Sequence, residues 1–215
     1  KRIQQALLPT DYVLKKHLHE HFILYKPKDI VSGDFYWINS VGTEDRGVAE
    51  SVEIHSVTPA PPRHTDIVLF ALADCTGHGV PGAFMSLLNI SFMNEITNER
   101  KITRPDEILN HVRNGVVNAL NPEGGVEKGM DGMDVSLVKL KIENEKLKMM
   151  DVSCANNPVY LVRNGVMTVI KADRQPVGFS YNPKPFTLDE IELQEGDTIY
   201  LVTDGYGDQF GGPKG

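Results

Sequence analysis

Three aspartates in this sequence adjoin strongly apolar, strand-like stretches. Asp74 ends the run IVLFALA, Asp204 follows the run IYLV, and Asp34 stands beside Gly33 ahead of the run FYWI. Three close carboxylates raise one another's pKa unless cations neutralise them, and a set of oxygen ligands favours Mg²⁺ or Mn²⁺ over zinc or copper. The three residues therefore predict one hard-cation site. The alternative is that each aspartate stabilises a turn by itself.

A glycine pattern, Gly77-x-Gly79-x-x-Gly82, follows Asp74 and opens a helix-like segment. Such a pattern is typical of dinucleotide-binding loops, but only within a βαβ unit with an acidic residue after the next strand. Here the next segment has the pattern of another helix, so we favour a different interpretation. The glycines make a tight turn, and Asp74 is the residue that takes part in the chemistry.

Other residues near these runs are weaker candidates. His78 could act as a general acid or base, or serve only the turn. Asp131 and Asp134, in the segment DGMDVSL, could join the acidic site or shape the start of a hairpin. The sequence has no GxSxG, HExxH, P-loop or EF-hand pattern.

Composition narrows the class of protein. The 215 residues are 40% hydrophobic, with a formal net charge of -7 and two distant cysteines. The negative charge argues against nucleic-acid binding, and the cysteines against a disulfide scaffold or thiolate zinc site. No apolar run is long enough to span a membrane. We expect a cytoplasmic protein without direct membrane insertion.

The elements that must position the candidates follow from periodicity. The sequence predicts a helix over 1–8 that Pro9 stops, strands over 21–27 and 33–41, an exposed, mobile loop over 40–65, and a buried strand over 66–74. Helices are expected over 81–97 and 105–120, and then strands over 133–142, 146–154, 158–165, 166–172, 186–194 and 197–204. Alternation in 135–142 predicts a sheet with one covered face. This order predicts an α+β sandwich.

Several segments together resemble a known family, the PPM metal-dependent protein serine/threonine phosphatases, in their bacterial SpoIIE/RsbU-like branch. The resemblance lies in QQALLP, SGDFYW, ADCTGHGVPGAFMS, DGMDVSL, CANNPVYLVRNG, DRQPVG and LVTDGYGDQFGG. These motifs occur in family order and extend over essentially the whole chain.

The resemblance implies an α-β-β-α sandwich of two antiparallel sheets flanked by helices, with two divalent cations, Mn²⁺ or Mg²⁺, at one edge. Asp74 matches the aspartate that bridges both metals, and the backbone carbonyl of Cys75 matches an adjacent metal contact. Asp34 and Asp204 match further ligands, and Asp131 matches a region that holds an additional, weaker metal in some relatives. A hydroxide that bridges the metals would then attack the phosphorus of phosphoserine or phosphothreonine.

The resemblance also implies domain limits and partners. Residues 1–8 would be the end of an upstream linker helix, and 9–215 a phosphatase domain that stops before the last metal-binding aspartate, so weak second-metal binding is expected. The implied substrate is a phosphoprotein of the anti-sigma-factor-antagonist (STAS) type. An upstream sensor or coiled segment would regulate the domain, which could form a homodimer. The alternative is a non-catalytic signalling module with the same fold.

Overall fold

The structure, a computed structural model, describes residues 2–18, 20–27, 29–43, 65–121, 131–143 and 146–207. In chain order its elements are α1 (Arg2–Leu7), α2 (Asp11–His17), β1 (Phe35–Thr43), β2 (Thr65–Cys75), α3 (Gly79–Asn94), the π-helical turn η1 (Glu95–Glu99), α4 (Pro105–Leu120), β3 (Gly132–Glu143), β4 (Lys146–Ala155), β5 (Val159–Arg163), β6 (Val166–Ile170), β7 (Val177–Gly178), β8 (Asp189–Glu192), β9 (Thr198–Leu201) and α5 (Asp204–Gly207).

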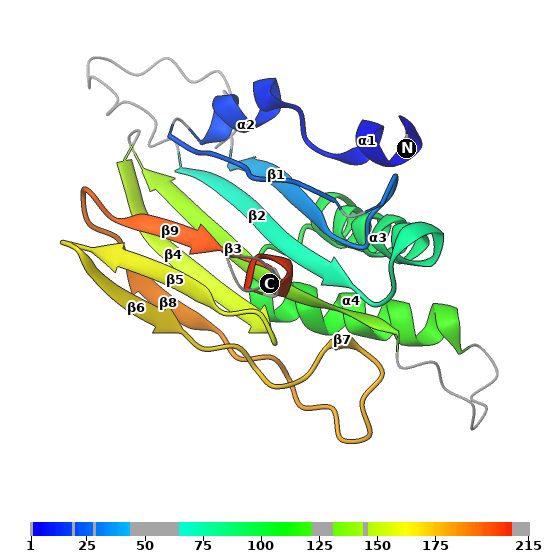
Figure 1. Ribbon diagram of the computed structural model, residues 1–215. Helices are drawn as coiled ribbons and strands as arrows, with labels where there is room; N and C mark the ends of the chain where they lie inside the picture. The colour runs from blue at the N-terminus through cyan, green and yellow to red at the C-terminus, as the bar shows by residue number, and fades with distance from the viewer. Residues whose placement is uncertain are drawn as a thin grey trace, which may run out of the picture.

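Two antiparallel sheets stack face to face, and α3 and α4 lie behind the larger one (Figure 1). The large sheet has the order β1-β2-β3-β4-β8, with β7 beside β3, and the small sheet has the order β6-β5-β9. The predicted α+β sandwich of antiparallel sheets is confirmed. The described residues form a helix–sheet–sheet stack, in which Val166, Met167 and Val169 of β6 remain exposed.

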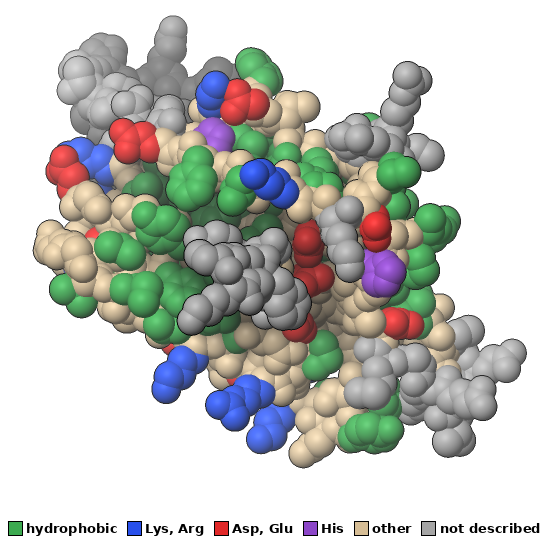
Figure 2. Space-filling model, in the orientation of Figure 1, with side chains coloured by type: hydrophobic (Ala, Val, Ile, Leu, Met, Phe, Trp, Pro, Cys, Tyr) green, Lys and Arg blue, Asp and Glu red, His purple; other side chains and the backbone are tan. Residues whose placement is uncertain are grey.

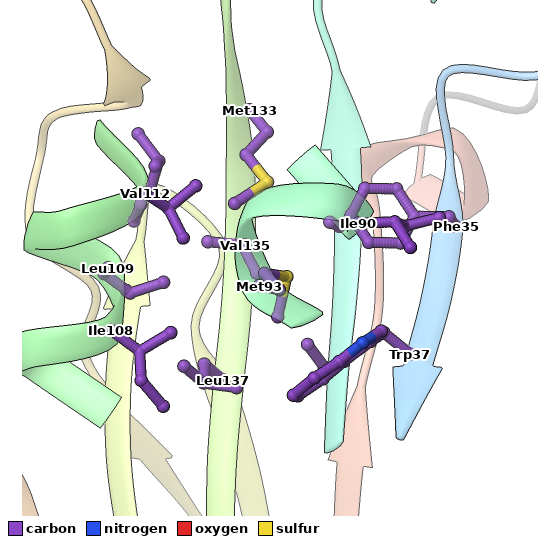
Figure 3. Packing of buried hydrophobic residues seen from close by; sticks show 14 of the residues in the cluster. Phe35, Trp37, Ile90, Met93, Ile108, Leu109, Val112, Met133, Val135 and Leu137 are labelled. Atoms are coloured by element: carbon purple, nitrogen blue, oxygen red, sulfur yellow. The ribbon is translucent and has the colours of Figure 1, made fainter. Parts of the chain in front are cut away.

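The core between the helices and the large sheet is built from alternate residues of each strand. Met133, Val135 and Leu137 of β3 meet Val112 and its neighbours on α4, as Figure 3 shows. The spacing of Ile108, Leu109, Val112 and Val116 places one apolar face of α4 on the sheet. The predicted helix over 105–120 is confirmed, and the helix predicted over 81–97 divides into α3 and η1.

A second core fills the space between the two sheets. Val138 and Leu140 of β3, together with Met150 and Val152 of β4, pack against Val159 and its neighbours in the small sheet. Strand β3 is therefore covered on both faces, whereas its alternating sequence predicted one covered face. That prediction was wrong because Lys139, which the alternation assigned to solvent, is buried beside Asp151.

The N-terminal segment differs most from expectation. Residues 21–27 form no strand, and Phe22, Ile23 and Leu24 are exposed. Their apolar, aromatic content predicted a strand, but they do not pair with β1, the edge strand of the large sheet, whose partner is β2. Helix α2, which was not predicted, begins at the N-cap Thr10, whose hydroxyl accepts from the backbone N–H of Val13. No helix in the described ranges is long and apolar enough to cross a bilayer.

The predicted loop over 40–65 is shorter than expected at both ends. Strand β1 continues to Thr43 and β2 begins at Thr65, and the whole of β1 pairs with residues 65–73 of β2. Residues 44–64 lie outside the described residues, so the mobility expected of this loop stays a prediction.

Candidate metal centre

Three neighbouring strands of the large sheet bring acidic residues to one edge. Phe35 of β1 lies opposite Ala73 of β2, so the preceding residue, Asp34, lies next to Asp74. Asp74 in turn lies directly opposite Asp134 of β3. Because adjacent strands are antiparallel, the start of β1, the end of β2 and the start of β3 meet at the same edge.

The small sheet supplies a fourth carboxylate. Strand β9 ends at Leu201, and Asp204 begins the short α5. The charge of Asp204 acts on Asp34, Asp74 and Asp134, so residues from both sheets converge. Figure 2 shows acidic side chains gathered near the centre of this face, over β2 and β3.

The three predicted aspartates interact as one acidic group. Burial, the neighbouring charge and hydrogen bond of Asp34, and those of Asp204 raise the pKa of Asp74 to about 8. Burial and the charge of Asp204 also raise the pKa of Asp34, against hydrogen bonds to Asp74 and Ser32 that lower it. Without a cation, Asp74 holds a proton that it shares with its neighbours.

Asp134 belongs to the same edge. Burial raises its pKa, and the charge of Asp204 adds to this, whereas a hydrogen bond from Asn156 lowers it. The Asn156 Nδ2 donates to Asp134 Oδ1 over 2.7 Å, from a left-handed backbone conformation with φ 56°. Asp134 is thus a fourth carboxylate that could contact a cation or its water shell.

The glycines bring three backbone segments into contact around the cluster. A Cβ on Gly33 would lie 2.6 Å from the carbonyl oxygen of Cys75, and one on Gly82 would lie 2.3 Å from that of Gly77. Gly77 and Gly79 have φ of 89° and 62°, which L side chains rarely adopt. The glycines therefore make the turn between Asp74 and α3. A second helix, α4, follows α3, so the βαβ unit of a dinucleotide site does not form.

The thiol of Cys75 is buried in the core and is not a candidate ligand or nucleophile. The side chain is 3% exposed within the core, and Asn89 Nδ2 lies 3.5 Å from its Sγ. Burial raises the pKa of the Cys75 thiol above its usual range, so the thiolate needed for nucleophilic attack does not form near neutral pH. Only the backbone carbonyl of Cys75, next to Asp74 and Gly33, is a candidate ligand.

His78 and Asp131 lie at the margin of the cluster. His78 is the N-cap residue of α3, its side chain is 85% exposed, and its Nδ1 lies 3.2 Å from Asp29 Oδ2. Asp131 precedes β3, where its carbonyl approaches Gly178 of β7. Neither side chain has a contact with Asp74 comparable to those of Asp34 and Asp204.

Sequence reasoning missed several residues that hold the acidic ones. Tyr25 donates from its hydroxyl to the carbonyl oxygen of Asp34 over 3.1 Å, and the Ser32 hydroxyl accepts from the Asp34 backbone N–H over 3.0 Å. Asn156 holds Asp134. Ser32 and Asn156 stand inside segments that support the family resemblance, but their spacing alone indicated no partner.

The donor set fits a hard divalent cation. Among the described residues, no three His, Cys, Asp or Glu side chains already surround a point where an ion could bind. Asp34, Asp74 and Asp204 nevertheless lie within hydrogen-bonding reach, and their excess negative charge is what raises the pKa of Asp74. A divalent cation would supply the positive charge that these oxygen ligands lack.

The stability of the metal-free protein should fall as the pH rises. Because the pKa of Asp74 is raised to about 8, the folded state keeps this proton up to that pH, while the unfolded state loses it near the ordinary aspartate pKa of 3.8. Between these values the folded state binds more protons, so each rise in pH favours unfolding. Because Asp74 is only half-buried, we expect a loss of about 1–2 kcal/mol between pH 5 and 8.

Urea denaturation in EDTA across this range measures the effect. Asp34 and Asp134 contribute in the same direction, since the pKa of each is also raised. Asp74→Asn should flatten the profile. Free energies of unfolding that increase from pH 5 to 8 would contradict this description of the cluster.

Comparison with known proteins agrees with the fold. The family model described as Stage II sporulation protein E (SpoIIE) matches residues 65–214. A search of curated protein sequences gave no match.

Solved structures with a similar fold include three bacterial proteins. The SiaA-PP2C domain of Pseudomonas aeruginosa is 28% identical, with a TM-score of 0.71 over 98% of this chain and 71% of that chain. The PP2C phosphatase domain of SpoIIE from Bacillus subtilis is 17% identical, with a TM-score of 0.53 over 82% of this chain and 42% of that chain. The RsbU and RsbW domains of Rv1364c from Mycobacterium tuberculosis are also 17% identical, with a TM-score of 0.51 over 85% of this chain and 47% of that chain.

Proposed function

The chain belongs to the SpoIIE family of PPM-type phosphatases, and on this premise we propose that it is a metal-dependent protein serine/threonine phosphatase. The observation that carries the proposal is the contact of Asp74 with both Asp34 and Asp204 at the edge of the large sheet. The proposed substrate is a phosphoserine or phosphothreonine of a signalling protein, of the STAS type that the family resemblance implies.

We assign the cation ligands to Asp34, Asp74, Asp204 and the carbonyl of Cys75, with Asp131 and Asp134 as candidates for a further ion or its waters. Two divalent cations, Mn²⁺ or Mg²⁺, would supply a water of lowered pKa and screen the charge of the phosphate. The residues of the chain orient these ions. The glycine contacts hold the strand ends together.

Proton transfer to the leaving serine oxygen is the role proposed for His78. Asp29 lies next to its Nδ1, so transfer would use Nε2 on the exposed side of the ring. Both described cysteines are buried with raised pKa, which disfavours a covalent thiol intermediate. Direct transfer of the phosphoryl group to water agrees better with these residues.

Removal of metal tests the function. Phosphate release from a phosphoserine peptide should require Mn²⁺ or Mg²⁺, stop in EDTA and return when the cation is restored. Mn²⁺ binding by calorimetry, measured on the same sample, separates the alternatives. Binding without phosphate release from any phosphoserine or phosphothreonine protein would favour the non-catalytic signalling module, and release that EDTA leaves unchanged would disprove the metal dependence.

A further inference from the structure

Gln4 of α1 forms hydrogen bonds with the turn that carries Asp34. Its side-chain Nε2 donates to the carbonyl oxygen of Ser32 over 2.5 Å, and its Oε1 accepts from the backbone N–H of Ser32 over 3.1 Å. One carboxamide thus binds both backbone groups of a residue 28 positions away. Gln4 is 6% exposed and Ser32 8% exposed, so water does not readily replace either bond.

The same carboxamide also reaches α3. Gln4 Nε2 donates to the hydroxyl of Ser86 over 3.0 Å, and that hydroxyl donates to the carbonyl oxygen of Ala83 over 2.9 Å. Ser86 is fully buried. Gln4 therefore joins α1, the turn over 31–34 and the helix that follows Asp74.

From Ser32 the contacts continue to the acidic cluster. The Ser32 hydroxyl accepts from the backbone N–H of Asp34 over 3.0 Å, and the Cys75 backbone N–H donates to the carbonyl oxygen of Gly33 over 3.4 Å. Gly33 packs so closely on Cys75 that a methyl group would not fit. A shift of Ser32 would consequently move Asp34 relative to Asp74.

We propose that Gln4 is a positioning residue for Asp34, so that the position of α1 against the turn over 31–34 sets the affinity of the acidic cluster for divalent cations. This inference rests on the proposed function, because it assumes that Asp34 is a cation ligand. Residues that orient a ligand from behind typically contribute 10- to 100-fold to metal affinity. Linkage makes the effect reciprocal, so a bound cation also holds α1 in place.

Gln175 offers a matched control within the chain. It is 9% exposed, donates to the carbonyl oxygen of Lys184 over 2.9 Å, and accepts from the backbone N–H of Lys184 over 3.0 Å. Its third partner is Arg113 of α4. Gln175 thus makes the same two-point backbone contact as Gln4, but to a segment that does not carry Asp34.

Calorimetric titration of the whole chain with Mn²⁺ tests the proposal. We expect Gln4→Ala to weaken Mn²⁺ binding about 10-fold or more, and Gln175→Ala to change it less than about twofold despite a similar loss of stability. Gln4→Glu keeps the oxygen that accepts from Ser32 but places a second acceptor oxygen against the Ser32 carbonyl, so it should also weaken Mn²⁺ binding. If Gln4→Ala fails to fold, the comparison of Gln4→Glu with Gln175→Ala tests the proposal.

The outcomes distinguish the positioning role of Gln4 from the proposed metal-dependent function. Wild-type affinity in Gln4→Ala and Gln4→Glu would overturn the positioning role alone, and so would an equal loss in Gln175→Ala. Absence of Mn²⁺ and Mg²⁺ binding by the unmodified chain would overturn the proposed metal-dependent function, and the positioning role with it.

Discussion

Asp74→Asn is expected to lower the affinity for Mn²⁺ by at least about 100-fold, since even residues behind a ligand contribute 10- to 100-fold, and to reduce phosphate release to background. Asp74 is the residue that contacts both Asp34 and Asp204. A carboxamide offers one oxygen and no charge, so it cannot replace a carboxylate between two cations. Calorimetry and phosphate release, measured in parallel, report the two losses.

The same substitution should leave the metal-free protein folded and at least as stable at pH 8. In the unmodified chain, burial beside two other acidic groups raises the pKa of Asp74 to about 8, so its ionisation opposes folding as the pH rises. Asparagine removes that charge while keeping the size of the side chain. A variant that loses function but gains stability at high pH separates a ligand from a structural residue.

Asp189→Asn is the matched control. Asp189 is an exposed residue at the start of β8, and its substitution makes the same chemical change away from the cluster. It should keep Mn²⁺ affinity and phosphate release within about twofold, since an exposed charge contributes little. Phosphate release by Asp74→Asn at the wild-type rate would refute the assignment of Asp74 as a ligand.

The position of the aspartates at strand ends could be predicted from the sequence because it depends only on neighbouring residues. An apolar run that ends in Asp74 indicates both the strand and the carboxylate at its edge. The meeting of Asp34 and Asp74 depends on the pairing of β1 with β2, which the recurring strand-end aspartates suggested and the family resemblance supported. The pairing of β2 with β3 also placed Asp134 opposite Asp74, which settled its position but not its role.

The residues that hold the cluster could not be found in this way. The contact between Gln4 and Ser32 joins residues 28 positions apart, and that between Asn156 and Asp134 joins residues 22 apart. Hydrogen bonds of this kind have no periodic signal, because they depend on how the completed elements pack. The segment over 21–27 shows the converse: its residues have high strand propensity, yet they form no strand beside β1, although β1 is an edge strand of the large sheet.

The burial of Lys139 in the core could not be predicted from the alternating sequence either. Alternation assigned it to a solvent-facing position, but α4 contacts both β3 and β4 and leaves Lys139 only 5% exposed. It forms an ion pair with Asp151, which lies opposite on β4 and is 2% exposed. Asp151 Oδ1 has no hydrogen-bond partner among the described residues, and Lys141 Nζ lies 3.8 Å from the other oxygen, Oδ2.

Lys139→Met should therefore lower the free energy of unfolding by about 3 kcal/mol at pH 7, because it leaves a buried carboxylate without its close partner. Lys139→Met/Asp151→Leu should recover most of this loss, since apolar side chains can replace a buried ion pair at little cost. Urea denaturation measures both variants.

An exposed ion pair provides the comparison for Lys139. Arg104→Met removes a cation that lies 2.9 Å from Asp106 but is 52% exposed, and it should cost less than about 1 kcal/mol. A double variant as unstable as the single one would show that Lys139 stabilises the core through packing of its side chain and not through its charge.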